Sequence, residues 1–412
     1  MNHIPNQEQQ EDAGIVIIGG GQAGGWAAKT LRESGYTGKL SVIGDEPHDF
    51  YERPPLSKAV LLDSEGQLGL TRLFSEEAVA ALNIDWHRPL RADGILRDKQ
   101  QVIMSNGEKL PYRQLLIATG GRPRRPEGLW QSHKKVLTLR SWNDALQLRT
   151  QLAQSKTLAV VGGGWIGLEI AASARKMGIA VTVFERQSAL CLRSIGSEVS
   201  QALLELHQNQ GVEVICGCGD ITLTDNNGQP ELKSELTESQ TFDLVVVGIG
   251  VILNLELAQQ AGLEVRGGGI VVDDQGRTSD PAIFAAGDVA LHSSLGICLQ
   301  SWAYAQNQAI TTARSMLDIG QQGYEEQAWL WSDQYAENIQ ILGIPANDSH
   351  CVIRQDGSSK VYFYLNANNQ LVQMVAFNDA RTIKLGKRWL LAKRELDPAQ
   401  LSDPSFSLMA LK

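Results

Sequence analysis

The sequence predicts an α/β protein with two Rossmann-like dinucleotide-binding domains and a smaller α+β domain at the C-terminus. Two glycine fingerprints support this prediction: Gly19-Gly-Gly21-Gln-Ala-Gly24 and Gly162-Gly-Gly164-Trp-Ile-Gly167. Each follows an apolar run and precedes a segment rich in small residues, which is the strand–turn–helix context of a G-x-G-x-x-G site. One match is weak evidence, whereas two in one chain indicate two dinucleotides bound side by side. Such a pair is typical of an enzyme that moves electrons between them.

Composition narrows the class of protein further. The 412 residues leave room for two or three domains, and 43% apolar with 20% charged residues is ordinary for a globular chain. A net charge of −9 argues against nucleic acid as a partner. No apolar run approaches the ~20 residues of a membrane helix. The polar, acidic stretch Met1–Asp12 lacks the features of a signal peptide, and we expect a disordered tail there.

Cysteine and histidine usage points to neither a disulfide framework nor a metal site. The five cysteines, at 191, 216, 218, 298 and 351, form no C-x-x-C pair. Cys216-Gly-Cys218 is the closest spacing, and we do not expect it to be redox-active. An odd count with loose spacing fits a reducing cytoplasm. The seven histidines show no metal-ligand spacing, so we predict no metal.

The expected elements of the first domain follow the first fingerprint in order. Apolar and small-residue patterns predict strands at Ile15–Ile18 and Lys39–Ile43, with a helix over Gly24–Ser34 between them. Prolines then force an extended path through Tyr51–Lys58, and Ser57 is expected to cap the next helix. Further strands are expected at Gln101–Ser105 and at Leu115–Ala118, the latter ending in Ala118-Thr-Gly-Gly121.

The second domain repeats this pattern, with a helix over Gly167–Met177 and a strand over Ala180–Phe184 that ends at Glu185. Two later apolar runs, Phe242–Val247 and Ala282–Ala286, are expected to complete the sheet of the first domain. Alternation at Lys360–Leu365 and Leu371–Phe377 predicts antiparallel strands joined by an Asn-rich turn. The predicted boundaries are 1–13 for the tail, 14–121 with 242–324 for the first domain, 122–241 for the second and 325–412 for the third.

The glycines of each fingerprint have separate physical roles. The first permits a tight turn, the second lets backbone amides approach a pyrophosphate, and the third lets helix and strand pack closely. The phosphates then lie on the helix N-terminus, where unpaired N–H groups and the helix dipole favour negative charge. We therefore predict one site at Gly19, Gly21 and Gly24 and another at Gly162, Gly164 and Gly167.

Acidic residues at the ends of the second strands identify the ribose ligands. Glu185 ends one such strand, and a carboxylate there can hold the adenine ribose hydroxyls. In the first domain Gly44 takes the equivalent position, so Asp45 is the predicted ligand and Glu46 the alternative; Asp45 could also simply begin a turn. A carboxylate at 185 repels a 2′-phosphate and favours NADH, although Arg186 argues for NADPH.

Asp288 is a candidate ligand for a similar reason, since it also stands just after the end of a predicted strand. It stands after the apolar run Ile283–Ala286 and Gly287, where it can hydrogen-bond the ribityl hydroxyls of a flavin. Alone it reads equally well as a helix cap, but the two fingerprints and Ala118-Thr119-Gly120 favour the flavin.

The order of these motifs resembles the two-dinucleotide-binding flavoprotein reductases of the glutathione reductase class. More closely, the chain resembles the ferredoxin reductases of Rieske-type aromatic-ring dioxygenase systems, to which the reductases of putidaredoxin and rubredoxin are related. The resemblance spans about residues 14–390. The segments that carry it are Arg53-Pro-Pro-Leu-Ser-Lys58, Ala118–Arg124, Thr138-Leu-Arg140, Gly162–Glu169, Phe284–Asp288, Ser301-Trp302 and Trp331-Ser-Asp-Gln-Tyr335.

The resemblance implies FAD in the first domain and NADH in the second. For FAD it implies a set comprising Gly19, Gly21, Gln22, Ala23, Gly24, Asp45, Arg53, Lys58, Ala92, Thr119, Gly120, Arg140, Gly287, Asp288, Ser301 and Trp302. For NADH the set comprises Gly162, Gly164, Trp165, Ile166, Gly167, Glu185 and Gly250.

The resemblance also implies two catalytic residues. Lys58 would lie near the flavin ring and stabilise negative charge that develops there. Glu169 would face the nicotinamide and pair with Lys58. Without the resemblance, Lys58 reads as an exposed lysine at a helix start.

The chain differs from these families by one missing motif and at two further positions. Reductases of the glutathione type need a redox cysteine pair after the first fingerprint, and the related oxidases and peroxidases use a single cysteine. Residues 44–66 contain none. Electrons are therefore expected to leave the flavin directly for a one-electron acceptor. The departures are Gln300 and Tyr304, where the family usually has glutamate and asparagine.

The sequence thus predicts an NADH- and FAD-dependent oxidoreductase whose partner is a [2Fe–2S] ferredoxin, expected to be of the Rieske type, that supplies a terminal dioxygenase. A rubredoxin or a P450 ferredoxin is the alternative acceptor. A flavin-bound redox sensor or interaction protein is the alternative of another class.

Overall fold

The computed structural model describes residues 13–320 and 323–411, so the tail expected at 1–13 lies almost wholly outside the described residues. By their contacts these residues form two units. The first unit comprises the chain up to Glu52, Leu70–Arg122 and Ile252–Glu326. The second comprises Arg53–Gly69, Pro123–Val251 and the chain from Gln327 onward.

The first unit is built on a sheet whose parallel part has the order β3-β2-β1-β6-β19. The strands β1, β2 and β19 are buried, near-continuous apolar runs, as expected where both faces of a parallel sheet are covered. The first half of β6 also joins an antiparallel meander with β5 and β4. The bounds are β1 (Gly14–Ile18), β2 (Leu40–Ile43), β3 (Asp85–His87), β4 (Ala92–Leu96), β5 (Gln101–Met104), β6 (Lys109–Ile117) and β19 (Ile283–Ala285).

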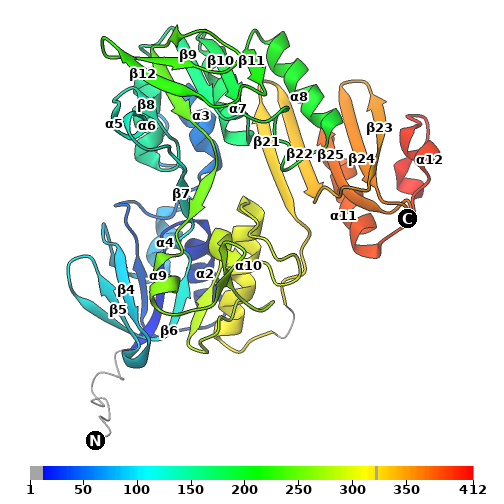
Figure 1. Ribbon diagram of the computed structural model, residues 1–412. Helices are drawn as coiled ribbons and strands as arrows, with labels where there is room; N and C mark the ends of the chain where they lie inside the picture. Colours follow the sequence, from blue (N-terminus) through cyan, green and yellow to red (C-terminus); the bar gives the residue numbers. More distant parts are fainter. Residues whose placement is uncertain (1–12, 321–322, 412) are drawn as a thin grey trace, which may run out of the picture. The chain divides into compact units, whose positions relative to one another are not determined.

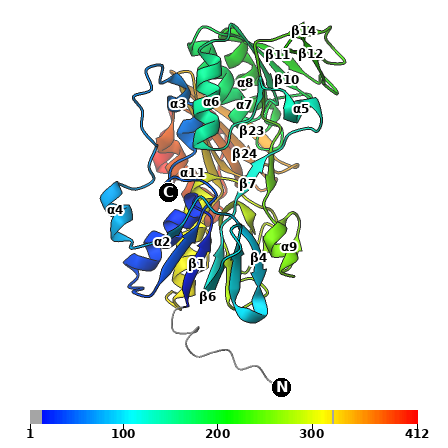
Figure 2. The ribbon, with the colours of Figure 1, turned by 90° about the vertical axis from the view of Figure 1, so that its left-hand side faces the viewer.

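Two helices of the first unit, α2 (Gln22–Glu33) and α10 (Trp302–Met316), pack against each other (Figure 1). The helix α2 also lies against β1, beside which it is drawn in Figure 2. The buried face of α2 consists of small residues, so the helix backbone approaches the sheet closely. The smaller elements of this unit are α4 (Glu76–Ala81), η2 (Arg97–Lys99), α9 (Glu256–Gln260), β17 (Val265–Arg266), β18 (Gly269–Val271), η3 (Gly287–Val289) and β20 (Ala290–Leu291).

The second unit contains a five-stranded parallel sheet of order β11-β10-β9-β15-β8. The helix α7 follows the second fingerprint and packs on β9 and β10. The bounds are β8 (Val136–Leu137), α6 (Trp142–Leu152), β9 (Thr157–Val161), α7 (Trp165–Lys176), β10 (Ala180–Glu185), α8 (Ser197–Asn209), β11 (Glu213–Cys216) and β15 (Leu244–Val247). An antiparallel sheet of β12 (Thr222–Asn226), β13 (Gln229–Lys233) and β14 (Gln240–Thr241) precedes β15.

The assignment of the strand at Phe242–Val247 to the first sheet is wrong. The strand β15 pairs with β9 and β8, so it completes the sheet of the second fingerprint. An apolar run fits any buried parallel strand, and its pattern alone does not choose between two sheets of the same kind. The other run is assigned correctly, because β19 pairs with β6 in the first sheet.

The C-terminal part of the second unit is an antiparallel sheet of order β21-β22-β25-β24-β23. The two strands expected from alternation, β24 (Ser359–Leu365) and β25 (Leu371–Phe377), are present and pair antiparallel. The remaining bounds are β21 (Trp329–Gln334), β22 (Glu337–Gly343), β23 (His350–Asp356), α11 (Ala380–Ala392), α12 (Pro398–Ser402) and η4 (Leu408–Ala410). The helix α11 packs on β22 and β25 through Ile383, Gly386 and Trp389, which recur at helical spacing.

Three short segments complete the second unit: η1 (Pro54–Ser57), α3 (Ala59–Leu62) and α5 (Leu129–Ser132). The paired strands β7 (Gly121–Pro123) and β16 (Val251–Leu253) lie where the chain passes from one unit to the other. The predicted α/β fold class is confirmed. The predicted three-domain boundaries stay a prediction. Within the described ranges, no helix is long and apolar enough to cross a membrane.

Candidate functional site

The first fingerprint forms the predicted strand–turn–helix, with each glycine in its expected role. Gly19 has φ +125°, and a Cβ there would lie 2.2 Å from the carbonyl oxygen of Ala118. A Cβ on Gly24 would lie 2.0 Å from the carbonyl oxygen of Gly19, whereas one on Gly21 would meet open space. The helix α2 has no side-chain cap and no acidic residue in its first turn. Its N-terminal amides therefore suit a phosphate.

Two other segments with predicted FAD contacts, those after β6 and β19, lie beside this turn in the first unit. The segment after β6 touches Gly19 at Ala118, and Thr119 is anchored to Asn254 through bonds of 2.8 and 2.9 Å between side chain and backbone. Gly287 has φ +78°, and a Cβ on it would approach the Cβ of Ala23 at 2.9 Å. The carboxyl ends of β1, β6 and β19 thus bring Gly19, Thr119, Gly120 and Gly287 together, with Asp288 next to Gly287.

The start of α10 adds a third group of contacts. Ser301 is the N-cap of α10 and accepts a hydrogen bond from the backbone N–H of Tyr304. With its amide oxygen turned toward them, Gln22 accepts hydrogen bonds from Nε1 of Trp302 at 3.1 Å and of Trp26 at 3.2 Å. The predicted contacts Gln22 and Trp302 are therefore neighbours at the glycine turn.

The end of β2 separates the two candidate ribose ligands. Glu46 accepts a hydrogen bond of 2.7 Å from the Tyr51 hydroxyl, while Asp45 is exposed at the strand end. The backbone N–H of Leu90 donates to the carbonyl of Gly44 at 2.8 Å, which brings the segment before Ala92 to the same strand end. This arrangement favours Asp45 over Glu46 as the ribose ligand, and the contact of Ala92 with FAD stays a prediction.

The second fingerprint repeats the geometry of the first. Gly162 has φ +111° and a Cβ on it would lie 2.4 Å from the carbonyl oxygen of Gly248, while Gly164 faces open space. A Cβ on Gly167 would lie 2.2 Å from the carbonyl oxygen of Gly162. The helix α7 again has no side-chain cap and no acidic first turn. Both glycine turns thus fit a pyrophosphate.

Two side chains at the start of α7 point to a ligand site, one by an unpaired polar atom and the other by an exposed apolar surface. The buried Nε1 of Trp165 has no hydrogen-bond partner among the described residues, and the apolar side chain of Ile166 is 43% exposed. An unpaired buried donor is rare in folded proteins and points to a ligand. Gly250, with φ +110°, follows the neighbouring strand β15 and accepts a backbone hydrogen bond from Arg124 at 2.8 Å.

Glu185 ends β10 and closes onto the second glycine turn. Its carboxylate accepts hydrogen bonds from the backbone N–H groups of Gly163 at 2.6 Å and Gln187 at 2.7 Å. It therefore lies against the second glycine turn, and its role as the ribose ligand stays a prediction. Arg186 points instead to Asp220, at 3.3 Å, and both side chains are exposed.

Lys58 and Glu169 form the salt bridge that the resemblance implies. The Nζ of Lys58 lies 2.8 Å from Oε2 of Glu169. Glu169 is 5% exposed, on the face of α7 that packs against η1, α3 and β21. A buried carboxylate needs several donors. Here it receives them from Lys58, from Ser57 and from Ser332, whose Oγ lies 2.6 Å from Oε1.

The predicted capping role of Ser57 is wrong. The N-cap of α3 is Lys58, and the Ser57 hydroxyl donates to Oε2 of Glu169 instead. Sequence reasoning also missed Ser332 as a site residue. The Trp331-Ser-Asp-Gln segment carries part of the family resemblance, but nothing local in it shows that β21 packs on α7.

The two predicted arginine contacts lie together in the second unit. The Nη1 of Arg53 donates to the carbonyl of Arg140 at 2.6 Å, and the backbone N–H of Arg140 donates to Asp144 at 3.0 Å. Asp144 belongs to the capping box of α6, so this short network fixes Arg140 at the start of that helix.

The thiols are poor candidates for redox chemistry. Burial raises the pKa of Cys216, Cys298 and Cys351 to about 11. It also raises the pKa of Cys191 and of Cys218. The thiolate is the reactive form, so all five cysteines are inert near neutral pH. Within the described ranges, no three His, Cys, Asp or Glu side chains are grouped to hold a metal ion.

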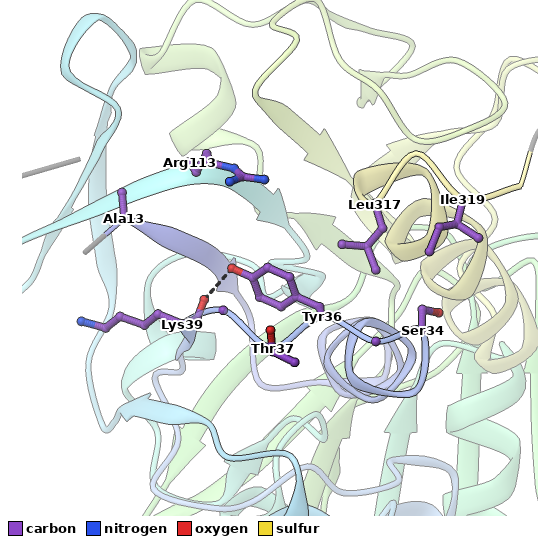
Figure 3. A pocket seen from close by; sticks show the side chains of 10 residues that line it. Ala13, Ser34, Tyr36, Thr37, Lys39, Arg113, Leu317 and Ile319 are labelled. Atoms are coloured by element: carbon purple, nitrogen blue, oxygen red, sulfur yellow. Dashed lines mark hydrogen bonds between the residues drawn. The ribbon is translucent and has the colours of Figure 1, made fainter. Parts of the chain in front are cut away.

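A cavity of about 580 Å³ in the first unit lies away from these sites (Figure 3). The turn after α2 lines it, together with Arg113, Leu317 and Ile319, and the Tyr36 hydroxyl donates to the Lys39 carbonyl at 3.0 Å. Residues 13 and 39 precede β1 and β2, so the cavity opens at the amino ends of the parallel strands. Nucleotides bind at the carboxyl ends of such strands, which excludes this cavity as the dinucleotide site.

Comparison with known proteins matches almost the whole chain. The family described as pyridine nucleotide-disulphide oxidoreductase matches residues 13–310, and the reductase C-terminal family matches residues 329–412. The chain is 35% identical over 402 residues to the ferredoxin–NAD(+) reductase component of the p-cumate 2,3-dioxygenase system of Pseudomonas putida, covering 96% of this chain and 97% of the relative.

Two solved structures are similar at 32% sequence identity and a TM-score of 0.90. One is the ferredoxin reductase for the CYP199A2 system from Rhodopseudomonas palustris, covering 97% of this chain and 99% of that chain. The other is the covalent complex of putidaredoxin reductase with putidaredoxin, covering 97% of this chain and 98% of that chain.

Proposed function

This chain belongs to the pyridine nucleotide-disulphide oxidoreductase family, and we propose that it is the reductase that passes electrons from NADH through FAD to a [2Fe–2S] ferredoxin of a dioxygenase system. The relative with this role is similar along nearly its whole length, including the C-terminal domain. No iron–sulfur ligand set is present in the sequence, so the cluster belongs to a partner.

The cofactors of the protein are FAD and NADH. FAD, when bound, accepts two electrons from NADH and can release them one at a time. The amides at the start of α2 suit the FAD pyrophosphate, with Asp45 on the ribose and Asp288 on the ribityl chain. The amides at the start of α7 suit the NADH pyrophosphate, with Glu185 on the ribose.

The single observation that carries the proposal is the absence of cysteine between residues 44 and 66. Disulfide reductases of this fold pass electrons from the flavin to a cysteine pair at that place. The raised pKa values of all five thiols support the same conclusion, because none supplies a thiolate at neutral pH. The electrons must therefore go from the flavin to an external one-electron carrier.

Lys58 is the proposed catalytic cation. Its ammonium group is held by Glu169 at 2.8 Å and donates to the carbonyl of Pro54 at 3.1 Å. A cation fixed before the reaction stabilises negative charge that develops on a neighbouring ring without reorganisation at the moment of transfer. Glu169 sets the position of that cation, and its carboxylate keeps the pair neutral as a whole.

A basic surface suits an acidic protein partner. In a chain of net charge −9, the outer face of α11 exposes Arg381, Lys384, Lys387 and Arg388. Lys387 also lies 5.1 Å from the ring centroid of Trp329, which stacks on Trp331 at 5.3 Å. Such a local positive patch steers an acidic ferredoxin toward the second unit.

A ferredoxin of a P450 system is the second candidate acceptor, because one similar structure is the ferredoxin reductase for the CYP199A2 system. Steady-state reduction of purified ferredoxins from both kinds of system tests the choice. The proposal expects kcat/KM for a Rieske-type ferredoxin to exceed that for a P450 ferredoxin at least tenfold. A reversed preference would assign the chain to a P450 system.

We place the protein in the cytoplasm. Five free cysteines are present among the described residues, and such usage is typical of a reducing compartment.

A further inference from the structure

A chain of buried hydrogen bonds runs from Glu169 to Tyr335 within the second unit. Ser332 Oγ lies 2.6 Å from Glu169 Oε1, and Gln334 Nε2 lies 3.1 Å from Ser332 Oγ. The next contact joins Gln334 Oε1 to His207 Nε2 at 2.8 Å, and the last joins His207 Nδ1 to the Tyr335 hydroxyl at 3.0 Å. The side chains of Ser332, Gln334 and His207 are completely buried.

The positions of the helices and strands explain why this series of hydrogen bonds forms. Ser332 and Gln334 are two residues apart on β21, so they point to the same face of that strand. That strand packs on α7, which carries Glu169. His207 lies in the last turn of α8, where it reaches Gln334. No step of the mechanism described above uses His207, Gln334 or Tyr335.

Only one direction of donation suits all four contacts. Glu169 accepts hydrogen bonds from Lys58, Ser57 and Ser332. The single hydroxyl hydrogen of Ser332 is therefore donated to the carboxylate. Its oxygen must then accept from the amide N–H of Gln334, which turns the amide oxygen toward His207. His207 must therefore donate from Nε2 and accept at Nδ1 from Tyr335.

The reverse direction of donation would leave the Glu169 carboxylate without its hydrogen bond from Ser332. If Gln334 were turned over, Ser332 would donate to its amide oxygen and would leave two acceptor oxygens 2.6 Å apart at Glu169. The surroundings keep the required protonation states. Burial lowers the pKa of His207, which keeps the imidazole neutral at pH 7, and burial raises the pKa of Tyr335, which keeps its hydroxyl protonated.

We propose that Ser332, Gln334 and His207 are positioning residues that hold the Glu169 carboxylate, and through it the Lys58 ammonium, in the geometry used for flavin reduction. This inference rests on the proposed function only for the role of Lys58. The direction of the hydrogen bonds is a property of the protein itself and is tested separately.

The first test reads the tautomer of His207 by ¹⁵N NMR of the histidine-labelled holoprotein at pH 7. The His207→Gln variant identifies the signal among the seven histidines. We expect a neutral ring with its proton on Nε2. A proton on Nδ1, or a cationic ring, would overturn the proposed direction whatever the protein reduces.

The second test measures flavin reduction by NADH in a stopped-flow instrument. Ser332→Ala removes one donor from Glu169, and we expect reduction to slow about tenfold with little change in the Kd for NADH. Ser332→Thr keeps the hydroxyl and should restore most of the rate. Asp333→Asn is the matched control, because Asp333 lies on the same strand as Ser332 but is exposed and accepts a hydrogen bond from Asn338 of β22.

A double-mutant cycle distinguishes a positioning role of Ser332 from a general loss of structure in the variant. If Ser332 acts through Lys58, Ser332→Ala should add no further slowing in the Lys58→Met background. Effects that simply multiply would contradict the proposal. If Lys58→Met alone leaves the rate unchanged, the proposed role of Lys58 fails, while the NMR result still decides the direction of the hydrogen bonds.

Discussion

Glu169 is the residue on which the candidate active centre depends. Three donors converge on its carboxylate: Ser57 of η1, Lys58 at the N-cap of α3 and Ser332 of β21. The helix that carries it begins at the second glycine turn. The pairing with Lys58 was predictable only from the resemblance, since residues 58 and 169 are far apart in the sequence and no local pattern links them. Ser332 was not predictable, because its contact depends on how β21 packs.

Lys58→Met tests the charge at this centre. The variant keeps the length and apolar stem of the side chain but removes the cation. We expect the rate of flavin reduction by NADH to fall about 10²-fold, the size of effect seen when one preorganised electrostatic group is lost. Lys58→Arg is the matched control and should retain part of the rate. An unchanged rate in the methionine variant would exclude Lys58 from catalysis.

Glu185 carries the prediction on nucleotide choice. Glu185→Ala should raise the Kd for NADH about 10- to 100-fold, because a charge-assisted hydrogen bond to the ribose is lost, and should relax discrimination against NADPH. Glu185→Gln removes the charge but keeps one amide oxygen for the N–H of Gly163, so it preserves one of the two backbone contacts and loses the one to Gln187. Titration by quenching of intrinsic fluorescence measures both constants. An unaltered NADH affinity in both variants would rule out the assignment.

At the scale of elements, local sequence patterns predicted the type and order of the helices and strands better than which strands pair with one another. The glycine turns, the helices after them and the strands β24 and β25 follow from spacing and alternation. The pairing of β15 did not, because Leu244–Val247 is an apolar run that suits either parallel sheet. The basic face of α11 is also not apparent from a local pattern, because its charges are separated by the buried residues of the same helix.

The outer face of α11 gives the prediction for the partner. Reversing charge in a Lys384→Glu, Arg388→Glu variant should raise the KM for the ferredoxin about tenfold at low salt, with the difference shrinking as ionic strength rises. Reduction of ferricyanide, a small acceptor, should not change. Lys134→Glu reverses an exposed charge elsewhere in the second unit and serves as the control. Equal effects of the two variants would remove α11 from the docking surface.

At the scale of the whole molecule, two nucleotide-binding folds occur in one chain without a thiol relay. The fingerprints predict the two nucleotides, and Asp45 and Glu185 are the predicted ligands of their riboses. The C-terminal sheet completes the centre by supplying Ser332 to Glu169. That contribution could not be read from the sequence, because it depends on the packing of segments that lie far apart along the chain.

We expect the flavin to store both electrons from NADH before they pass to the ferredoxin. Anaerobic titration with NADH, followed by addition of oxidised ferredoxin, tests this most directly. The flavin absorbance should bleach fully with one NADH per FAD, and the reduced protein should then reduce two ferredoxin molecules. Uptake of a second NADH equivalent, or failure of the reduced flavin to reoxidise with ferredoxin, would contradict direct transfer from flavin to an iron–sulfur carrier.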